Sequence, residues 1–124
     1  MSTPDFKLSQ ISIVMLGTKD LARSTEFYRD RLGLEVRNQT PGFVFFNAGP
    51  VMLCLNEPLA RVAGNAISGA SEIVFPVDHV RAAYEALQGK GVEFTHEPRN
   101  VYGQSWAANF NDPDGHKLSI FGNE

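Results

Sequence analysis

The sequence has a single cysteine, no long apolar run and no cluster of one charge. Cys54 has no intrachain disulfide partner and fits a reducing compartment, so we expect a cytoplasmic protein. The apolar stretches fall far short of the roughly 18 residues that cross a bilayer, which argues against a membrane partner. The net charge of −3 comes from mixed signs, so the basic surface that nucleic acid requires is also missing.

The chain of 124 residues contains an internal repeat. Residues 13–21 and 72–80 are both apolar strand patterns that run into a turn containing an aspartate. An amphipathic stretch follows each one, over residues 21–32 and 80–87, and then a glycine and a further strand pattern. An offset of about 59 residues between like segments indicates two copies of one unit. Two like halves in one small domain predict a cleft between or within them.

Local signals place the elements of each copy. Asp20 is the predicted N-cap of the first helix, and Gly33 its left-handed C-cap. Further strands are predicted at residues 34–38, 43–47 and 51–55, and residues 56–70 are predicted to be a linker. In the second copy we expect a strand at 72–77, a helix at 79–88, strands at 92–95, 106–111 and 117–121, and a loop at 97–103.

Two motifs lie within the repeat, one in each copy. The first is Asp20-Leu-Ala-Arg-Ser-Thr-Glu-Phe-Tyr-Arg-Asp-Arg-Leu-Gly-Leu-Glu-Val36. The second is Val101-Tyr-Gly103 followed by Asn111-Asp-Pro-Asp-Gly-His-Lys-Leu-Ser-Ile120. Together they resemble the vicinal oxygen chelate superfamily, which includes glyoxalase I, extradiol dioxygenases and bleomycin-resistance proteins. The resemblance covers about residues 9–121, nearly the whole chain.

The resemblance implies an α+β fold in which two βαβββ modules form an open, curled mixed sheet, an incomplete barrel with helices outside. It implies one domain over residues 1–124, with module one at about 9–57 and module two at about 70–122. Many members of the superfamily pair as homodimers, so a homodimer is expected.

Enzymes of the superfamily commonly hold a divalent metal at four matching strand positions. The resemblance places these positions at Ile13, Cys54, Glu72 and Ser119 of this chain. Ile13 has no donor atom, and a neutral serine is a poor ligand. Because a catalytic site needs about three protein ligands and an open position, we predict no metal cofactor, with a divalent metal as the alternative. In this respect the chain is similar to the metal-free, bleomycin-resistance-like members.

Glu72 is the candidate catalytic residue. Strand alternation should turn Ile73, Phe75 and Val77 toward the helix and place Glu72 and Val74 on the cavity side. There Glu72 could act as a general base. The alternative is an ordinary glutamate at a strand end, reaching water.

Aromatic and sulfur-containing side chains are the candidate ligand contacts, because small-molecule sites are mostly apolar with few polar groups. The predicted set is Trp106, Tyr102, Phe43, Phe45, Met52, Cys54 and Phe110, and Trp106 is the first choice. Core packing is the alternative and must hold for some of them, since alternation sends neighbouring phenylalanines to opposite faces.

Three functions follow from these residues. The first is a metal-independent protein that sequesters a small organic ligand in an aromatic cleft. The second is a lyase, isomerase or dioxygenase of the superfamily, using either an atypical metal ligand set or Glu72 as general base. The third is a relic without a small-molecule role, which requires a cleft filled by its own side chains.

Overall fold

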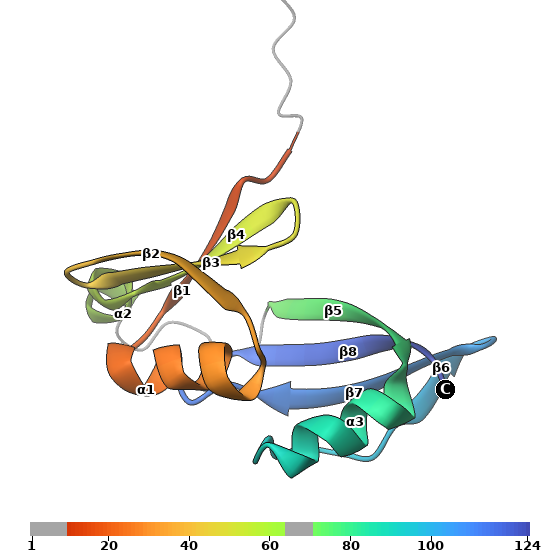
Figure 1. Ribbon diagram of the computed structural model, residues 1–124. Helices are drawn as coiled ribbons and strands as arrows, with labels where there is room; N and C mark the ends of the chain where they lie inside the picture. The colour runs from red at the N-terminus through yellow and green to blue at the C-terminus, as the bar shows by residue number, and fades with distance from the viewer. Residues whose placement is uncertain (1–9, 64–70) are drawn as a thin grey trace, which may run out of the picture.

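The computed structural model describes residues 10–63 and 71–124, whose strands form two four-stranded sheets (Figure 1). Sheet A belongs to the first repeat and sheet B to the second. The first repeat contains β1 (Ile13–Gly17), α1 (Leu21–Glu26), the π-helical turn η1 (Phe27–Arg31), β2 (Glu35–Thr40), β3 (Phe43–Ala48) and β4 (Val51–Asn56). After it come α2 (Glu57–Ala63), β5 (Glu72–His79), α3 (Val80–Gly89), β6 (Arg99–Tyr102), β7 (Ser105–Asn111) and β8 (Lys117–Asn123).

Both sheets have the same topology. The strand order is β1-β4-β3-β2 in sheet A and β5-β8-β7-β6 in sheet B. In each sheet the first and last strands of the repeat pair in parallel, and the other pairs are antiparallel. The sequence repeat is therefore a structural βαβββ repeat. The predicted α+β fold of two βαβββ modules without a closed barrel is confirmed, and its strands form two mixed sheets.

The first helix has the predicted caps. The Asp20 carboxylate accepts a hydrogen bond of 3.0 Å from the Arg23 amide. The last turn widens into η1, where the Leu32 amide donates to the Phe27 carbonyl oxygen. Gly33 then takes a left-handed φ of 83°, as a C-cap residue does. Within the described ranges, no helix is long and apolar enough to cross a membrane.

One hydrophobic core serves both repeats. On β5, Ile73, Phe75 and Val77 pack against it while Glu72 and Val74 are exposed, which confirms the predicted alternation. The helix α3 lies across the core-facing side of sheet B (Figure 1). The buried members come from both sheets, from η1 and α3, and from the segment after α3: Leu16, Phe27, Tyr28, Val44, Phe46, Leu53, Leu55, Val80, Val92, Ala108, Phe110, Leu118 and Ile120.

Two predictions in the second repeat were wrong. Residues 99–102, predicted as part of a loop, form the edge strand β6, which pairs with β7. All four side chains of β6 are exposed, so its sequence carries no alternation of apolar and polar residues. Residues 92–95, predicted as a strand, contribute an isolated bridge between Phe94 and Phe110.

The predicted linker at 56–70 contains the short helix α2. Asn56 caps it, because its Oδ1 accepts a hydrogen bond of 2.9 Å from the Leu59 amide. Pro58 stands in the first turn, where a proline costs no helical hydrogen bond. The remainder of the predicted linker, residues 64–70, lies outside the described residues.

Hydrogen bonds from α1 to the turn between β7 and β8 join the two repeats. Asp114 Oδ2 accepts from the hydroxyl groups of Thr18 and Ser24, each at 2.7 Å. Asp114 Oδ1 accepts from the Lys19 amide at 3.0 Å and lies 3.6 Å from Arg23 Nη2. The Asp114 side chain is only 7% exposed, so these bonds are shielded from water.

Asp112 makes the second half of this inter-repeat clasp. The buried Tyr28 hydroxyl donates to Asp112 Oδ2 at 2.8 Å. Asp112 Oδ1 accepts from the backbone amides of Asp114 and His116, which fixes the turn. Burial and the nearby carboxylate raise the pKa of Tyr28 far above its ordinary value, so the phenol remains a donor. The name inter-repeat clasp is used below for Asp112, Asp114 and their partners in residues 18–28, which lie on α1, on η1 and just before α1.

Removing the Asp114 charge should weaken the clasp. Burial raises the pKa of Asp114, but hydrogen bonds from the Lys19 amide and two hydroxyls outweigh it, and the net pKa lies below the ordinary value. A lowered folded-state pKa stabilises the fold above the unfolded pKa of about 4, and this stability is lost as the pH falls through the folded pKa. Urea unfolding should therefore show Asp114→Asn destabilised by about 1–3 kcal/mol at pH 7. Below a pH of about 4, the difference in unfolding free energy between Asp114→Asn and the wild type should become smaller.

The matched control is Asp30→Asn, at an exposed carboxylate that pairs with its neighbour Arg29. Its stability should change little, because exposed ion pairs contribute little. Equal effects of the two substitutions at pH 7 would contradict the clasp.

Gly122 is required where β8 passes β5. A Cβ at this position would overlap the Val77 carbonyl oxygen, which is backbone and cannot move aside alone. Gly122→Ala should lower the free energy of unfolding by about 2–3 kcal/mol, measured by urea denaturation. Gly89→Ala is the control, since a Cβ there meets no atom within 4 Å. It should be neutral or slightly stabilising.

Candidate functional site

Each sheet has one face turned away from the hydrophobic core, called its open face below, and α2 packs on part of the open face of sheet A, since a Cβ at Gly17 would meet Ala60 at 3.1 Å. On sheet A this open face carries Phe43, Phe45 and Cys54, while the alternate residues of β3 and β4 belong to the core. On sheet B it carries Glu72 and the residues in register with it, turned away from α3. Both open faces have exposed apolar side chains: Met15 on sheet A is 42% exposed, and Val74 and Phe121 on sheet B are 49% and 40% exposed.

Side chains from the neighbouring strands hold the Glu72 carboxylate. Asn109 on β7 donates its Nδ2 to Glu72 Oε2 at 2.8 Å. Ser119 on β8, which is 3% exposed, donates its hydroxyl to Glu72 Oε1 at 3.4 Å. Because β8 lies between β5 and β7, the three side chains line up across the sheet. The carboxylate is thus oriented by two neutral donors.

His96 extends this array and was missed by the sequence reasoning. Its Nε2 lies 2.8 Å from Asn109 Oδ1, and its Nδ1 lies 2.6 Å from the Glu97 carbonyl oxygen. The backbone brings it there, since the Thr95 amide donates to the Asn109 carbonyl oxygen. No local sequence pattern predicts this contact, because His96 lies in irregular backbone two residues before Pro98. We call His96, Asn109, Glu72 and Ser119 the polar array.

The open face of sheet A is aromatic. The Phe43 and Phe45 rings stack with centroids 6.5 Å apart and an angle of 16° between their planes. Both are half-buried, and Met52 is also half-buried at the start of β4. Cys54, opposite Phe45 in register, is fully buried, and its thiol donates to the Leu55 carbonyl oxygen at 3.5 Å. Four of the predicted ligand contacts therefore lie on this sheet.

Of the other three predicted contacts, Phe110 and Trp106 do not share the face of Glu72. Phe110 is 1% exposed in the core, and Trp106 is half-buried and packs against the same core cluster. Alternation on β7 turns both toward α3, and Asn109 toward Glu72. Tyr102 lies on the edge strand β6 and is 83% exposed. The prediction from the sequence used the alternation of side-chain directions along β3 but not along β7, so it grouped Trp106 and Phe110 with the other ligand contacts.

The four positions expected for a metal do not form a donor set. Ile13 supplies no donor atom, and burial raises the pKa of the Cys54 thiol, which disfavours the thiolate that binds metals. The Ser119 hydroxyl is neutral and already donates to Glu72. In residues 10–63 and 71–124, no three His, Cys, Asp or Glu side chains come together as a potential metal site. The residues present do not fit the metal centre of the superfamily.

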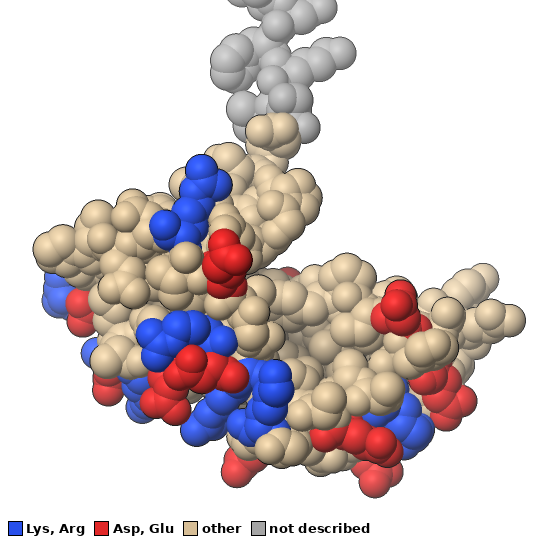
Figure 2. All heavy atoms as spheres, in the orientation of Figure 1, with Lys and Arg blue, Asp and Glu red and all other residues tan. Residues whose placement is uncertain are grey.

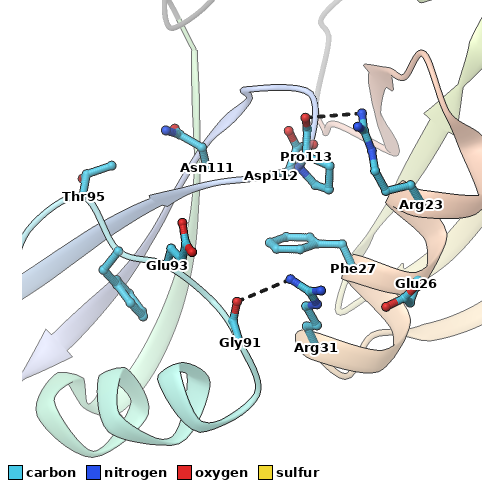
Figure 3. Close-up of a pocket in the computed structure, with 11 residues that line it drawn as sticks. Arg23, Glu26, Phe27, Arg31, Gly91, Glu93, Thr95, Asn111, Asp112 and Pro113 are labelled. Carbon is cyan, nitrogen blue, oxygen red and sulfur yellow. Dashed lines mark hydrogen bonds between the residues drawn. The ribbon is translucent and has the colours of Figure 1, made fainter.

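A pocket of about 540 Å³ lies elsewhere, between α1 and the segment before β6 (Figure 3). The Phe27 ring points into its middle. Arg23 and Arg31 form one wall and bridge to the facing backbone, donating to the carbonyl oxygens of Pro113 and Gly91 at 3.4 Å each. This pocket contains none of the predicted ligand contacts.

A second pocket of about 410 Å³ lies between β5 and the turn that joins β3 to β4. Its lining is apolar apart from Asn47 and includes Met52 and Val74. The hollow between the two repeats is mostly free of charged side chains in Figure 2, whereas Lys, Arg, Asp and Glu gather over the helices. Apolar surface is thus available near both open faces.

Comparison with known proteins defines the class. The model of the Glyoxalase/Bleomycin resistance protein/Dioxygenase superfamily matches residues 10–120. The chain belongs to this superfamily.

The similar proteins have names that describe different activities. The chain is 29% identical to lactoylglutathione lyase of Haemophilus influenzae, over 93% of each chain. It is 30% identical to mitochondrial methylmalonyl-CoA epimerase of Mus musculus, over 73% of this chain and 58% of the epimerase. The crystal structure of a glyoxalase/bleomycin resistance protein/dioxygenase from Nocardioides superposes with a TM-score of 0.79 and 25% identity, covering 96% of this chain and 86% of that one.

Cys54 should behave as a buried, unreactive thiol. It is fully buried, and burial raises its pKa, so the reactive thiolate is scarce. Ellman's reagent at pH 8 should react with the native protein more than about tenfold slower than with the urea-unfolded protein. Equal rates would show that Cys54 is accessible to the reagent and would contradict its burial on sheet A.

Proposed function

We propose that the protein binds a small organic ligand on its open sheet faces without a metal. The observation that carries this proposal is the mismatch at the four metal positions, where Glu72 alone offers a suitable donor. The apolar surface around those positions is nevertheless present, as the stacked Phe43 and Phe45 rings demonstrate. Sites for small molecules combine such apolar surface with a few oriented polar groups, which the polar array supplies. The single cysteine supports a reducing, cytoplasmic setting.

We further propose that the protein is a homodimer. Exposed apolar side chains on both open faces are typical of surfaces that a partner covers. In a dimer with two-fold symmetry, the open face of sheet A in each copy would oppose the open face of sheet B in the other copy. The same pair of faces would therefore meet at two equivalent places. The ligand would then lie between the aromatic face of one copy and the polar array of the other.

A second candidate function is proton transfer with Glu72 as general base. The hydrogen bonds from Asn109 and Ser119 favour it, because a catalytic carboxylate must be held in one orientation. The 30% identity to a protein named as an epimerase points in the same direction. The lyase and dioxygenase activities of metal-dependent relatives would need a ligand set that this chain lacks.

Metal analysis and ligand binding together test the first proposal. Purified protein should contain only substoichiometric metal, and titration with nickel, zinc, manganese or iron should give no chelator-sensitive stoichiometric site. In chelator-containing buffer, calorimetry should detect binding of planar aromatic ligands. Phe45→Leu should weaken this binding roughly two- to tenfold, since it removes a ring and keeps an apolar side chain.

Phe94→Leu is the matched control, because Phe94 packs against Tyr84 and Phe110 on the side of α3. Its ligand affinity should equal that of the wild type. A stoichiometric, chelator-sensitive metal would contradict the proposal. Incorporation of deuterium from heavy water into a bound ligand, abolished in Glu72→Gln, would favour the second candidate instead.

A further inference from the structure

The Glu72 carboxylate has unused acceptor capacity. A carboxylate offers about four acceptor positions on its two oxygens. Among the described side chains, Asn109 and Ser119 each fill one, and the Ser119 bond is long at 3.4 Å. The side chain is exposed, so the remaining positions face the open side of sheet B. A ligand on this face would meet an acceptor that is already oriented.

No described cation pairs with Glu72. The ion pairs of residues 10–63 and 71–124 are Arg23–Asp114, Arg29–Asp30 and Arg81–Glu124. Lys117 is the register neighbour of Glu72 on β8, yet it makes no ion pair with it in the described structure. The two groups that hold the carboxylate, an amide and a hydroxyl, are both neutral. Within the described residues the carboxylate is therefore held by neutral groups and forms no ion pair.

The neighbours of Glu72 define the rest of the surface. Val74, two residues along β5, is 49% exposed, and Phe121 on β8 is 40% exposed. Alternation places both on the same face as Glu72. A ligand seated here would contact apolar side chains with its body and the carboxylate with its polar end.

The polar array fixes the position of the carboxylate. Asn109 donates its Nδ2 to Glu72, while its Oδ1 lies 2.8 Å from His96 Nε2 on the other side. An ordinary strand-end glutamate reaching water would need no such support. Fixing a side chain in advance strengthens its contact with a ligand, because less freedom is lost on binding.

We infer that Glu72 receives a protonated nitrogen of the ligand, so that the ligand is an organic monocation with an apolar body. This inference rests on the proposed binding function. A charge-assisted bond from an ammonium group is about twice as strong as one from a neutral donor. One carboxylate suits one positive charge, and the low net charge of −3 gives no support for a polycation. Asn109 and His96 are positioning residues that act through Glu72.

Two probes of nearly equal shape test this inference by calorimetry in chelator-containing buffer at pH 7. They are 1-naphthylmethylamine, which carries an ammonium group, and 1-naphthalenemethanol, which is neutral. The amine should bind at least about tenfold more tightly than the alcohol. Glu72→Gln should abolish this preference, because it removes the negative charge that the ammonium group would pair with. Asn109→Ala should reduce the preference without removing it.

Glu85→Gln is the control, an equal loss of charge on α3 at the other side of sheet B, and it should keep the full preference. Thermal unfolding of each variant checks that the fold is intact. Equal affinities of the wild-type protein for the two probes would overturn the inference and leave the binding function standing. Failure to bind either probe would contradict both.

The oligomeric state supplies a further outcome. If Glu72→Gln dissociates a dimer, as measured by sedimentation, the carboxylate already pairs with a cation of the second copy. The inference would then be wrong. An unchanged assembly together with a lost preference for the amine would support it.

Discussion

The inter-repeat clasp is the interaction on which the rest of the structure depends. Two carboxylates of one turn, Asp112 and Asp114, bind the first helix of the other repeat through a buried phenol, two hydroxyls and a backbone amide. Shielded bonds of this kind have strict geometry, so they fix how the repeats sit together. With the first repeat bound to sheet B in this way, η1 and α3 contribute to the shared core, and the opposite face of each sheet is turned away from that core. The location of the candidate site follows from that arrangement.

Much of the fold could be predicted because its signals are local. The repeat, the Asp20 cap and the left-handed Gly33 each depend on a few neighbouring residues. The exposure of Glu72 and Val74 also follows from strand alternation alone. The resemblance added the topology, which local signals do not contain. These parts of the prediction agree with the structure because tertiary contacts reinforce the local preferences.

The parts that could not be predicted depend on contacts between distant segments. His96 joins Asn109 and Glu72 only because an isolated bridge brings irregular backbone beside β7. The clasp spans more than 80 residues of sequence and uses ordinary serine, threonine and tyrosine side chains. The face of Trp106 could have been predicted by extending alternation along β7, and the aromatic set then divides between two faces. The candidate site consequently consists of the aromatic open face of sheet A and the separate polar array.

We propose above all that these two surfaces form a metal-free ligand site between two copies of the chain. A crystal structure of the untreated, purified protein tests it most directly. We expect a two-fold dimer in which the Phe43 and Phe45 face of one copy opposes Glu72 of the other, with organic rather than metal density between them. A metal ion bound by Cys54 or Glu72, or a monomer whose open faces are covered only by solvent, would contradict the claim.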